Sequence, residues 1–373
     1  MDDEILGESE PEKSTNEKKN WIKLSLIIGI IIILIIVIII ILMFTVLKKE
    51  EEDKDNQIID DKTILDTIPK EELDKARNSF NQSSFIDTVD SSKIINYNLF
   101  LPKNYNKEKK YPLIVFIGDL STLGNDTKIP ITQTVGGPIW ATETVQKNHE
   151  SIVLVPEYNE VLIDDRFGNY SKSEYINVTV RLINELKSKY SIDSDRIYGT
   201  GQSMGAMTTL YLLSNNQDLF AAGLIVDGNW LIDELLGLVN STFVYFAAGG
   251  DTKCVDGQNE IKNLLTSNNI KYGSLEEINA QEKIEILNEK ANEMLNQGNK
   301  QNFITYAKGT VTPPGSSYQN EHMASFKYGY RIDAVRDWIF SQKKVNNWQD
   351  RSSSSSFSCD KCGFNICSFC LIS

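Results

Sequence analysis

The strongest constraint on the fold is an alternation of strand-like and helix-like segments between about residues 80 and 342. Apolar, β-branched runs such as "YPLIVFIG", "SIVLVPEY", "RIYGTG", "AAGLIVDG" and "STFVYFAAGGD" alternate with segments of helical periodicity. In "SEYINVTVRLINELKSKY", Ile176, Val180, Ile183 and Leu186 recur on one face of a helix. Strands that alternate with helices predict a mostly parallel sheet with helices on both faces, which is an α/β fold.

The two ends of this region extend the pattern. "SSFIDTV" and "KIINYNLFLP" are predicted as early strands, and "NFITYAKGTV" as a late one. "GQNEIKNLLTSNN" and "SLEEINAQEKIEILNEKANEML" are predicted as helices, the second as a charged, solvated cover. "SFKYGYRIDAVRDWIFSQ" is predicted as a single closing amphipathic helix.

A run of 24 residues without a charge, residues 24–47, stands apart from this pattern. As a helix it would be about 36 Å long, enough to cross a hydrocarbon core of roughly 30 Å. The run is too long for a cleavable signal, and no small-residue cleavage site follows it. We therefore predict a transmembrane helix at residues 24–47, a disordered tail at 1–23 and a charged juxtamembrane stalk at 48–79.

Composition and net charge argue against some classes of binding partner. The chain has 373 residues, of which 41% are hydrophobic, so most of it is expected to fold around a core. Its formal net charge of −13, without a basic stripe, argues against nucleic acid and against docking on anionic lipid.

A serine between two glycines lies where a strand-like run meets a helix-like run. Gly201, Ser203 and Gly205 form a G-x-S-x-G motif within "RIYGTGQSMGAMTTLYL". The motif marks a nucleophile only if it sits on a strand-to-helix turn and if an acid and a base follow it in the chain. We predict Ser203 as that nucleophile.

The base and the acid follow from chain order. Of the two histidines, His322 follows the last predicted strand, whereas His149 precedes the motif and is interpreted as a surface or partly packed residue. Asp251 ends an apolar strand between Ser203 and His322 and is the predicted acid. Asp227 and Asp256 are rival candidates for the acid. The alternative interpretation of Asp251 is an ordinary loop carboxylate in a turn.

An acyl-transfer site also needs backbone N–H donors for the developing oxyanion. One is expected from Met204, directly after the nucleophile, and the second from the main chain of Asp119, in the loop after "LIVFIG". Neither side chain is implicated. No cofactor and no metal are predicted, and the acidic pair Asp164 and Asp165 is interpreted as part of a solvated loop.

These motifs together resemble a known family. "RIYGTGQSMGAM", "PITQTVGGPIWATETVQKNHESIVLVPEY", "GGDTKCVDG" and "GTVTPPG…EHMASFKYGYRIDAVRDWIFSQ" resemble secreted and surface α/β-hydrolases of an esterase or peptidase branch, akin to feruloyl esterases and polyhydroxybutyrate depolymerases. The likeness covers roughly residues 80–342. It implies Ser203, Asp251 and His322 as nucleophile, acid and base. Many relatives have His-Gly where this chain has Ile117 and Gly118.

The resemblance implies carboxylic-ester hydrolysis by a catalytic domain, residues 80–344, on an ester that is polysaccharide-linked or a small aryl or acyl ester. Two alternatives stay open: a serine peptidase of the same fold, and an inactive surface binding or adhesion domain.

Orientation in the membrane is undecided by charge, because three lysines lie on each side of the apolar run: Lys18, Lys19, Lys23, Lys48, Lys49 and Lys54. The acidic stalk and the exported relatives favour a cytoplasmic N-terminus and an extracellular or lumenal catalytic domain.

The remaining cysteines carry weaker signals. The Ser/Cys-rich tail, residues 345–373, holds two C-x2-C pairs that are too close for an ordinary zinc ribbon, so disulfides or an unstructured tail are the favoured interpretations. These cysteines are Cys359, Cys362, Cys367 and Cys370. Cys254, near Asp251, is interpreted as an isolated thiol.

Overall fold

The computed structural model describes residues 26–29 and 68–344, except residues 169, 315 and 317–319. The chain divides into two units, Met1–Ile59 and Asp60–Ser373. In the first unit, positions 26–29 are helical. The rest of the predicted membrane span lies outside the described residues, as do the two predicted tails and the stalk up to residue 67. None of the helices in the described part of the chain has both the length and the apolar character of a bilayer span.

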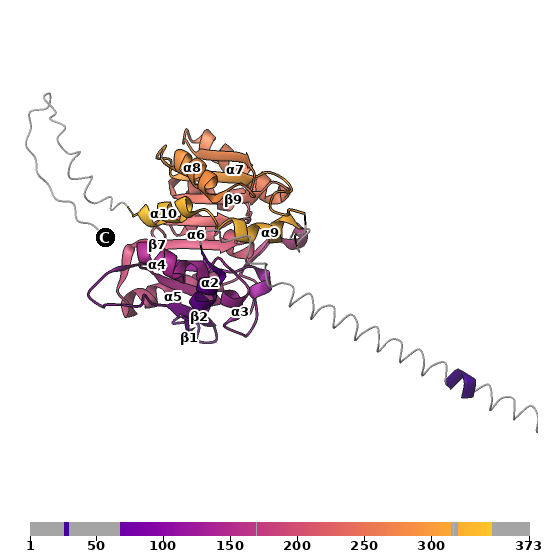
Figure 1. The fold of residues 1–373 in the computed structure, drawn as a ribbon. Helices are drawn as coiled ribbons and strands as arrows, with labels where there is room; N and C mark the ends of the chain where they lie inside the picture. Colours follow the sequence, from indigo (N-terminus) through magenta and orange to yellow (C-terminus); the bar gives the residue numbers. More distant parts are fainter. Residues whose placement is uncertain (1–25, 30–67, 169, 315, 317–319, 345–373) are drawn as a thin grey trace, which may run out of the picture. The chain divides into compact units, whose positions relative to one another are not determined.

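The second unit is built on a nine-stranded sheet with the strand order β1-β2-β4-β3-β7-β8-β9-β11-β10 (Figure 1). Strands β1 and β2 run antiparallel, β2 and β4 also pair antiparallel, and all other pairs of this sheet are parallel. The strands are β1 (Asn81–Ile86), β2 (Ile94–Phe100), β3 (Tyr111–Ile117), β4 (Ile152–Glu157), β7 (Ile192–Gln202), β8 (Ala222–Val226), β9 (Phe243–Ala248), β10 (Gly273–Ile278) and β11 (Gln301–Tyr306). A two-stranded ribbon joins β5 (Ile163–Asp164) and β6 (Ser171–Lys172).

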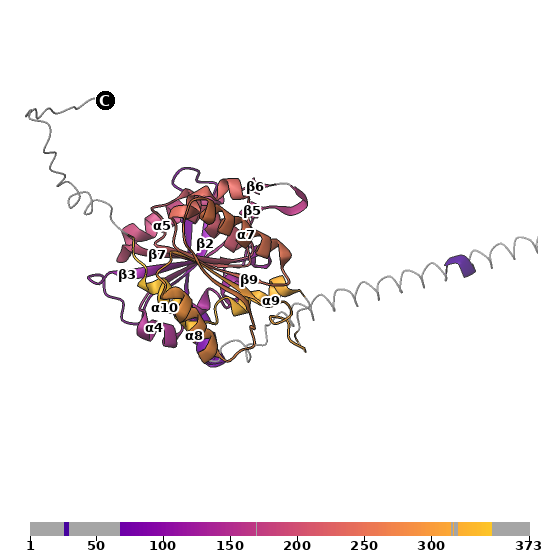
Figure 2. The same ribbon diagram turned by 90° about the horizontal axis from the view of Figure 1, so that it is seen from above.

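Helices cover both faces of the sheet. Figure 2 shows α5 and α7 on one face and α4, α8 and α10 on the other. The helices are α2 (Lys70–Arg77), α3 (Ile129–Thr132), α4 (Glu143–Asn148), α5 (Tyr175–Lys189), α6 (Met204–Asn215), α7 (Thr252–Ser267), α8 (Ile284–Leu295), α9 (Glu321–Tyr328) and α10 (Asp333–Ser341). The predicted mostly parallel α/β architecture is confirmed.

The central strands form a rigid support because they are buried along their whole length. Every residue of β3, β4, β8 and β9 is buried, as expected for parallel strands covered on both faces. On one face of the sheet, the apolar side chains of these strands join those of α5, α6 and α7 in a hydrophobic core. In open parallel sheets, sites form beyond the carboxyl ends of the strands, and the predicted site residues follow β3, β7 and β9.

The segment predicted as one long helix, residues 274–295, is a strand followed by a helix, so that prediction was wrong. Strand β10 pairs in parallel with β11 at the edge of the sheet, with Leu275 opposite Ile304. Only residues from Ile284 onward are helical. Tertiary pairing outweighs the helical propensity of "LEE" here, because the edge of β11 offers a partner that the local sequence does not reveal.

The predicted closing helix is also divided, into α9 and α10. A Cβ at Gly329, just after α9, would lie 2.5 Å from a methyl group of Val226, so the chain passes too close to β8 for a larger residue. The break lets the buried Arg331 donate hydrogen bonds to the carbonyls of Ala280 and Glu282, ahead of α8.

Helix α2 lies within the segment that the sequence assigns to the stalk. Its Leu73 and Ala76 are buried, and Arg77 donates a hydrogen bond to the carbonyl of Ile131. The folded unit therefore includes residues that charge and composition alone place outside it.

Candidate active site

Ser203 occupies a strained turn between β7 and α6. Its φ of 50° and ψ of −119° are unusual for a residue with a side chain, and strain of this kind is concentrated at functional sites. A Cβ at Gly205 would lie 1.9 Å from the carbonyl oxygen of Ile117, and one at Gly201 would lie 2.4 Å from the carbonyl carbon of Gly205. The two glycines are therefore required for the turn that exposes the serine, as the motif predicts.

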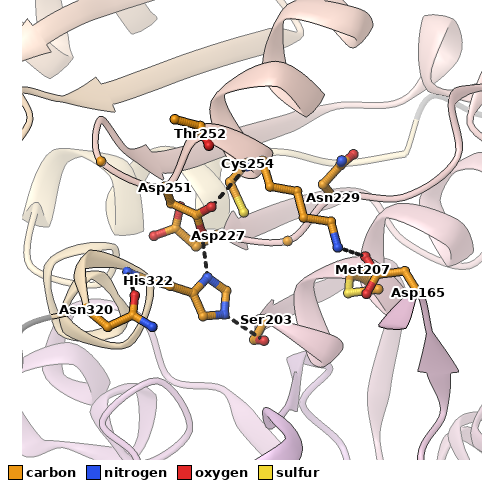
Figure 3. Close-up of a pocket in the computed structure, with 13 residues that line it drawn as sticks. Asp165, Ser203, Met207, Asp227, Asn229, Asp251, Thr252, Cys254, Asn320 and His322 are labelled. Carbon is orange, nitrogen blue, oxygen red and sulfur yellow. Dashed lines mark hydrogen bonds and ion pairs between the residues drawn. The ribbon is translucent and has the colours of Figure 1, made fainter. Parts of the chain in front are cut away.

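The structure brings the three predicted catalytic side chains together (Figure 3). The Ser203 hydroxyl lies 2.9 Å from His322 Nε2, and His322 Nδ1 lies 2.6 Å from Asp251 Oδ2. The three residues come from the end of β7, the loop after β9 and the first turn of α9. Serine, imidazole and carboxylate thus form one continuous hydrogen-bonded chain.

Asp251 has a second function as the N-cap of α7, where its carboxylate accepts a hydrogen bond from the Cys254 amide. Burial opposes ionisation of Asp251, but the hydrogen bond and charge of His322 outweigh it and lower the pKa of this carboxyl. Asp251 is therefore ionised at neutral pH and orients the imidazole.

His322 lies in the first turn of α9, where the Asn320 side chain caps the helix by accepting a hydrogen bond from the His322 amide. Burial alone would lower the pKa of His322, but the bond to Asp251 and the negative charge of Asp227 outweigh it and raise the pKa. The carboxylates around the imidazole therefore favour its protonated form, which a general base must reach during the reaction.

Glu321 holds two loops of the site in place and was not identified from the sequence. Its carboxylate accepts hydrogen bonds from the amides of Gly250 and Gly309, both 2.8 Å long. Gly250 leads into Asp251, and Glu321 precedes His322, so one side chain ties the acid's loop to the base's helix. Backbone amides in loops need hydrogen-bond acceptors, and a glutamate directly before the catalytic base is the sequence feature that could have identified Glu321 as one.

The predicted oxyanion donors lie next to the serine. Met204 is the first residue of α6, a position where the N–H has no acceptor within its own helix. Asp119 follows β3, whose Ile117 pairs with Gly201 on β7. The carboxylate of Asp119 accepts a hydrogen bond of 2.6 Å from the side-chain amide of Gln202, the residue before the nucleophile. The loop is fixed beside the elbow, and the role of both N–H groups stays a prediction.

The rival residues occupy different environments. Asp227 directly follows β8 and is fully buried, and its Oδ1 accepts a hydrogen bond from the Ala248 amide. Burial raises the pKa of Asp227 to about 7, although the charge of His322 partly offsets this. Asp256 is exposed on α7. His149 pairs with Asp337, and its ring stacks on Phe340.

The triad opens into a cleft of about 350 Å³. At the cleft, Lys253 forms an ion pair with Asp165 (Figure 3). The side chain of Asp165 is only 12% exposed, so the interpretation of this aspartate as part of a solvated loop was wrong. The cleft is lined by Asp165, Ser203, Met207, Asp227, Gly228, Asn229, Gly250, Asp251, Thr252, Lys253, Cys254, Asn320 and His322.

Comparisons with known proteins agree with this architecture. Residues 163–236, which include the serine elbow, match the prolyl oligopeptidase family of peptidases. No curated protein sequence matches the chain. A thermostable esterase of known structure is 22% identical, with 72% of this chain and 64% of that chain covered and a TM-score of 0.57. The chain therefore spans less than two thirds of the length of that esterase.

A ferulic acid esterase from the anaerobic fungus Anaeromyces mucronatus is 17% identical, with 68% of this chain and 88% of that chain covered and a TM-score of 0.41. A score this low supports no conclusion about activity. The sheet order and the thermostable esterase define the fold, which is that of the α/β-hydrolases, and the match to the prolyl oligopeptidase family falls on the part of it that carries the serine elbow.

Proposed function

We propose that the protein hydrolyses carboxylic esters through an acyl-enzyme on Ser203. The observation that carries this proposal is the hydrogen-bonded chain from Ser203 through His322 to Asp251, anchored on a strained strand-to-helix turn. A serine hydroxyl is a weak nucleophile until a base accepts its proton, and the imidazole is within hydrogen-bond distance to do so.

In the acylation step, the Ser203 oxygen attacks the ester carbonyl carbon while His322 Nε2 takes the hydroxyl proton. Asp251 stabilises the imidazolium that forms. The N–H groups of Met204 and Asp119 are the proposed donors to the carbonyl oxygen as it becomes negative. The imidazolium then returns its proton to the alkoxide that leaves, and the acyl group stays on Ser203.

In the deacylation step, His322 takes a proton from a water molecule, and the resulting hydroxide attacks the acyl-enzyme. The carboxylic acid leaves as the imidazole returns the proton to Ser203. The net reaction consumes one water molecule and yields an acid and an alcohol.

The size of the cleft favours small esters. A volume of about 350 Å³ is close to the lower end, roughly 300 Å³, of the range for small-molecule sites. A short acyl or aryl group fits such a space. A serine peptidase is the second candidate, and the match to the prolyl oligopeptidase family is the observation that favours it.

A matched pair of substrate panels separates the two activities. We expect the full chain to hydrolyse short-chain, aryl and feruloyl esters with a higher kcat/KM than amides that carry the same acyl group. Ser203→Ala should abolish the turnover of both panels and so control for contaminating hydrolases. Preference for the amides, or for peptide amides over every ester, would overturn the esterase proposal.

We propose further that residues 24–47 anchor the enzyme in a membrane, with the catalytic domain on the extracellular or lumenal side. The uncharged run of 24 residues and the acidic segment that follows it support this arrangement. Protease added to intact cells should remove the catalytic domain if it is extracellular, and protease added to sealed organelle vesicles should spare it if it is lumenal. A domain that survives in intact cells but is digested while the organelle vesicles are still sealed would contradict the orientation.

A further inference from the structure

A thiol that the proposed mechanism does not use lies beside the acid and the base. Cys254 is in the first turn of α7, is only 3% exposed and lines the same cleft as the triad. One ligand atom each from Asp251, Cys254 and His322 can be chosen so that all three lie within 4.8 Å of one another. In Figure 3 the sulfur of Cys254 lies beside the carboxylates of Asp251 and Asp227.

The spacing and the chemistry of these atoms fit one metal ion. Zinc is bound by thiolate sulfur at about 2.3 Å and by imidazole nitrogen or carboxylate oxygen at about 2.0–2.2 Å. Ligand atoms on such a tetrahedron are about 3.3–3.7 Å apart, so a bound ion would replace the 2.6 Å hydrogen bond between His322 Nδ1 and Asp251 Oδ2 and draw Cys254 toward both residues. A mixed sulfur, nitrogen and oxygen set favours Zn²⁺ over Mg²⁺ or Ca²⁺, which prefer oxygen alone.

A fourth group points to a cation at this place. Asp227 is fully buried, and within the described chain its Oδ2 has no hydrogen-bond partner. The Ser325 hydroxyl donates to the His322 carbonyl, and its interaction with Asp227 lowers the pKa of that carboxyl without offsetting the effect of burial. The one lysine in this turn of α7, Lys253, is paired with Asp165. The groups that can lose a proton here, two carboxyls and one thiol, therefore outnumber the single imidazole that can carry a positive charge.

We propose that Zn²⁺ binds to Cys254 Sγ, His322 Nδ1 and a carboxylate oxygen of Asp251, and that this binding reversibly switches the enzyme off. The fourth position is left for water or for Asp227. Binding displaces the thiol proton to solvent. The imidazole proton moves from Nδ1 to Nε2, since Nδ1 now holds the metal.

Inhibition follows from that change of tautomer. With a proton on Nε2, His322 donates toward Ser203 and can no longer accept the serine proton. Asp251 is at the same time withdrawn from its role of orienting the ring. Because one thiol proton is released on binding, inhibition should strengthen as the pH rises.

The kinetic test uses the full chain and adds ZnCl₂ to the ester assay, with chelator added afterwards. It rests on the proposed esterase activity. We expect micromolar Zn²⁺ to inhibit the wild type and EDTA to restore the rate. Removing a residue that only hydrogen-bonds to a metal ligand typically weakens metal binding by about 10–100-fold. Cys254→Ser, which loses a direct ligand, should raise the inhibitory concentration by at least about 100-fold. Equal inhibition of the two proteins, or none in either, overturns the proposal.

The C-terminal cysteines require a control, because C-x2-C pairs can also hold zinc. A variant that combines Cys359→Ser, Cys362→Ser, Cys367→Ser and Cys370→Ser should keep the wild-type sensitivity to Zn²⁺. In that variant, Cd²⁺ should produce the ultraviolet band of a metal thiolate, and adding Cys254→Ser should remove it. This measurement needs neither turnover nor an active Cys254 variant, so it separates failure of the zinc site from failure of the proposed function. No band with Cys254 in place overturns the site.

Discussion

The ends of β8 and β9 offer two aspartates of opposite character on adjacent strands. Asp251, after β9, is partly exposed, is bound to His322 and caps a helix, and these interactions lower its pKa. Asp227, after β8, is fully buried with one partner on Oδ1, and burial raises its pKa to about 7. The same side chain is therefore ionised at one strand end and largely protonated below neutral pH at the other.

The difference shows that an acid in a triad is defined by its partners rather than by its distance along the chain. The two strands pair in register, and both aspartates approach the same imidazole (Figure 3). Of the two, only Asp251 lies within hydrogen-bond distance of Nδ1, and Glu321 accepts a hydrogen bond from Gly250 in the loop that carries it. Asp227 raises the pKa of His322 only through its charge, which it carries as the pH rises through about 7.

The largest effect should come from Asp251→Asn. The amide cannot stabilise an imidazolium and favours the wrong tautomer, so we expect kcat to fall by about 10⁴-fold in an ester assay. Asp227 should not compensate, since it does not reach Nδ1. A loss of less than about tenfold would show that the two strand ends are interchangeable.

Glu321→Gln should have the next largest effect. A neutral amide can accept only one of the two glycine hydrogen bonds well, so the loop that carries Asp251 loosens. A shift of about 1 Å in a catalytic group costs roughly 100-fold. We expect that loss in kcat with little change in KM. Glu285→Gln, an exposed glutamate on α8, is the matched control and should leave both constants unchanged.

Asp227→Asn should change kcat by less than about tenfold but alter how stability depends on pH. A buried carboxyl with a raised pKa stabilises the fold fully below its unfolded pKa near 4, and this stability is lost as the pH rises through about 7. The loss is about 1.4 kcal/mol per pH unit. The free energy of unfolding of the variant should therefore rise relative to that of the wild type between about pH 5 and about pH 7, a range inside that window. Thermal unfolding at several pH values measures this difference. A parallel pair of stability curves would mean that Asp227 is ionised in the folded protein.

The smallest effect concerns the cap of α7. Asp251→Ala removes the acceptor of the Cys254 amide, whereas Asp251→Asn keeps an oxygen there. An N-cap is worth about 1 kcal/mol, so the alanine variant should melt about 2–4 °C below the asparagine variant. Equal melting temperatures would show that the carboxylate of Asp251 does not support the helix.

Much of this site was predictable because it is local or ordered along the chain. The elbow at Ser203 follows from two glycines at a strand-to-helix junction, and chain order separates His322 from His149. The central strands followed from continuous apolar runs such as "YPLIVFIG". These features depend on short segments whose burial is evident from their composition.

Other features depend on contacts between distant segments and could not be predicted. The sequence predicts a helix at β10 because its partner strand, β11, is more than 20 residues away in the chain. The break at Gly329 depends on the approach of Val226, and the role of Glu321 depends on two loops from other parts of the sheet. The sequence predicts a solvated Asp165 because its ion-pair partner, Lys253, lies far away in the chain.

The central claim, that Ser203 is a nucleophile activated by His322, is tested most directly by an active-site fluorophosphonate. The phosphorus of such a probe bonds covalently to an activated serine, and mass spectrometry of the digested protein locates the label. We expect one label on the peptide that contains Ser203, and none with Ser203→Ala or on the heat-unfolded wild type. An unlabelled native protein, or a label on another serine, would contradict the account.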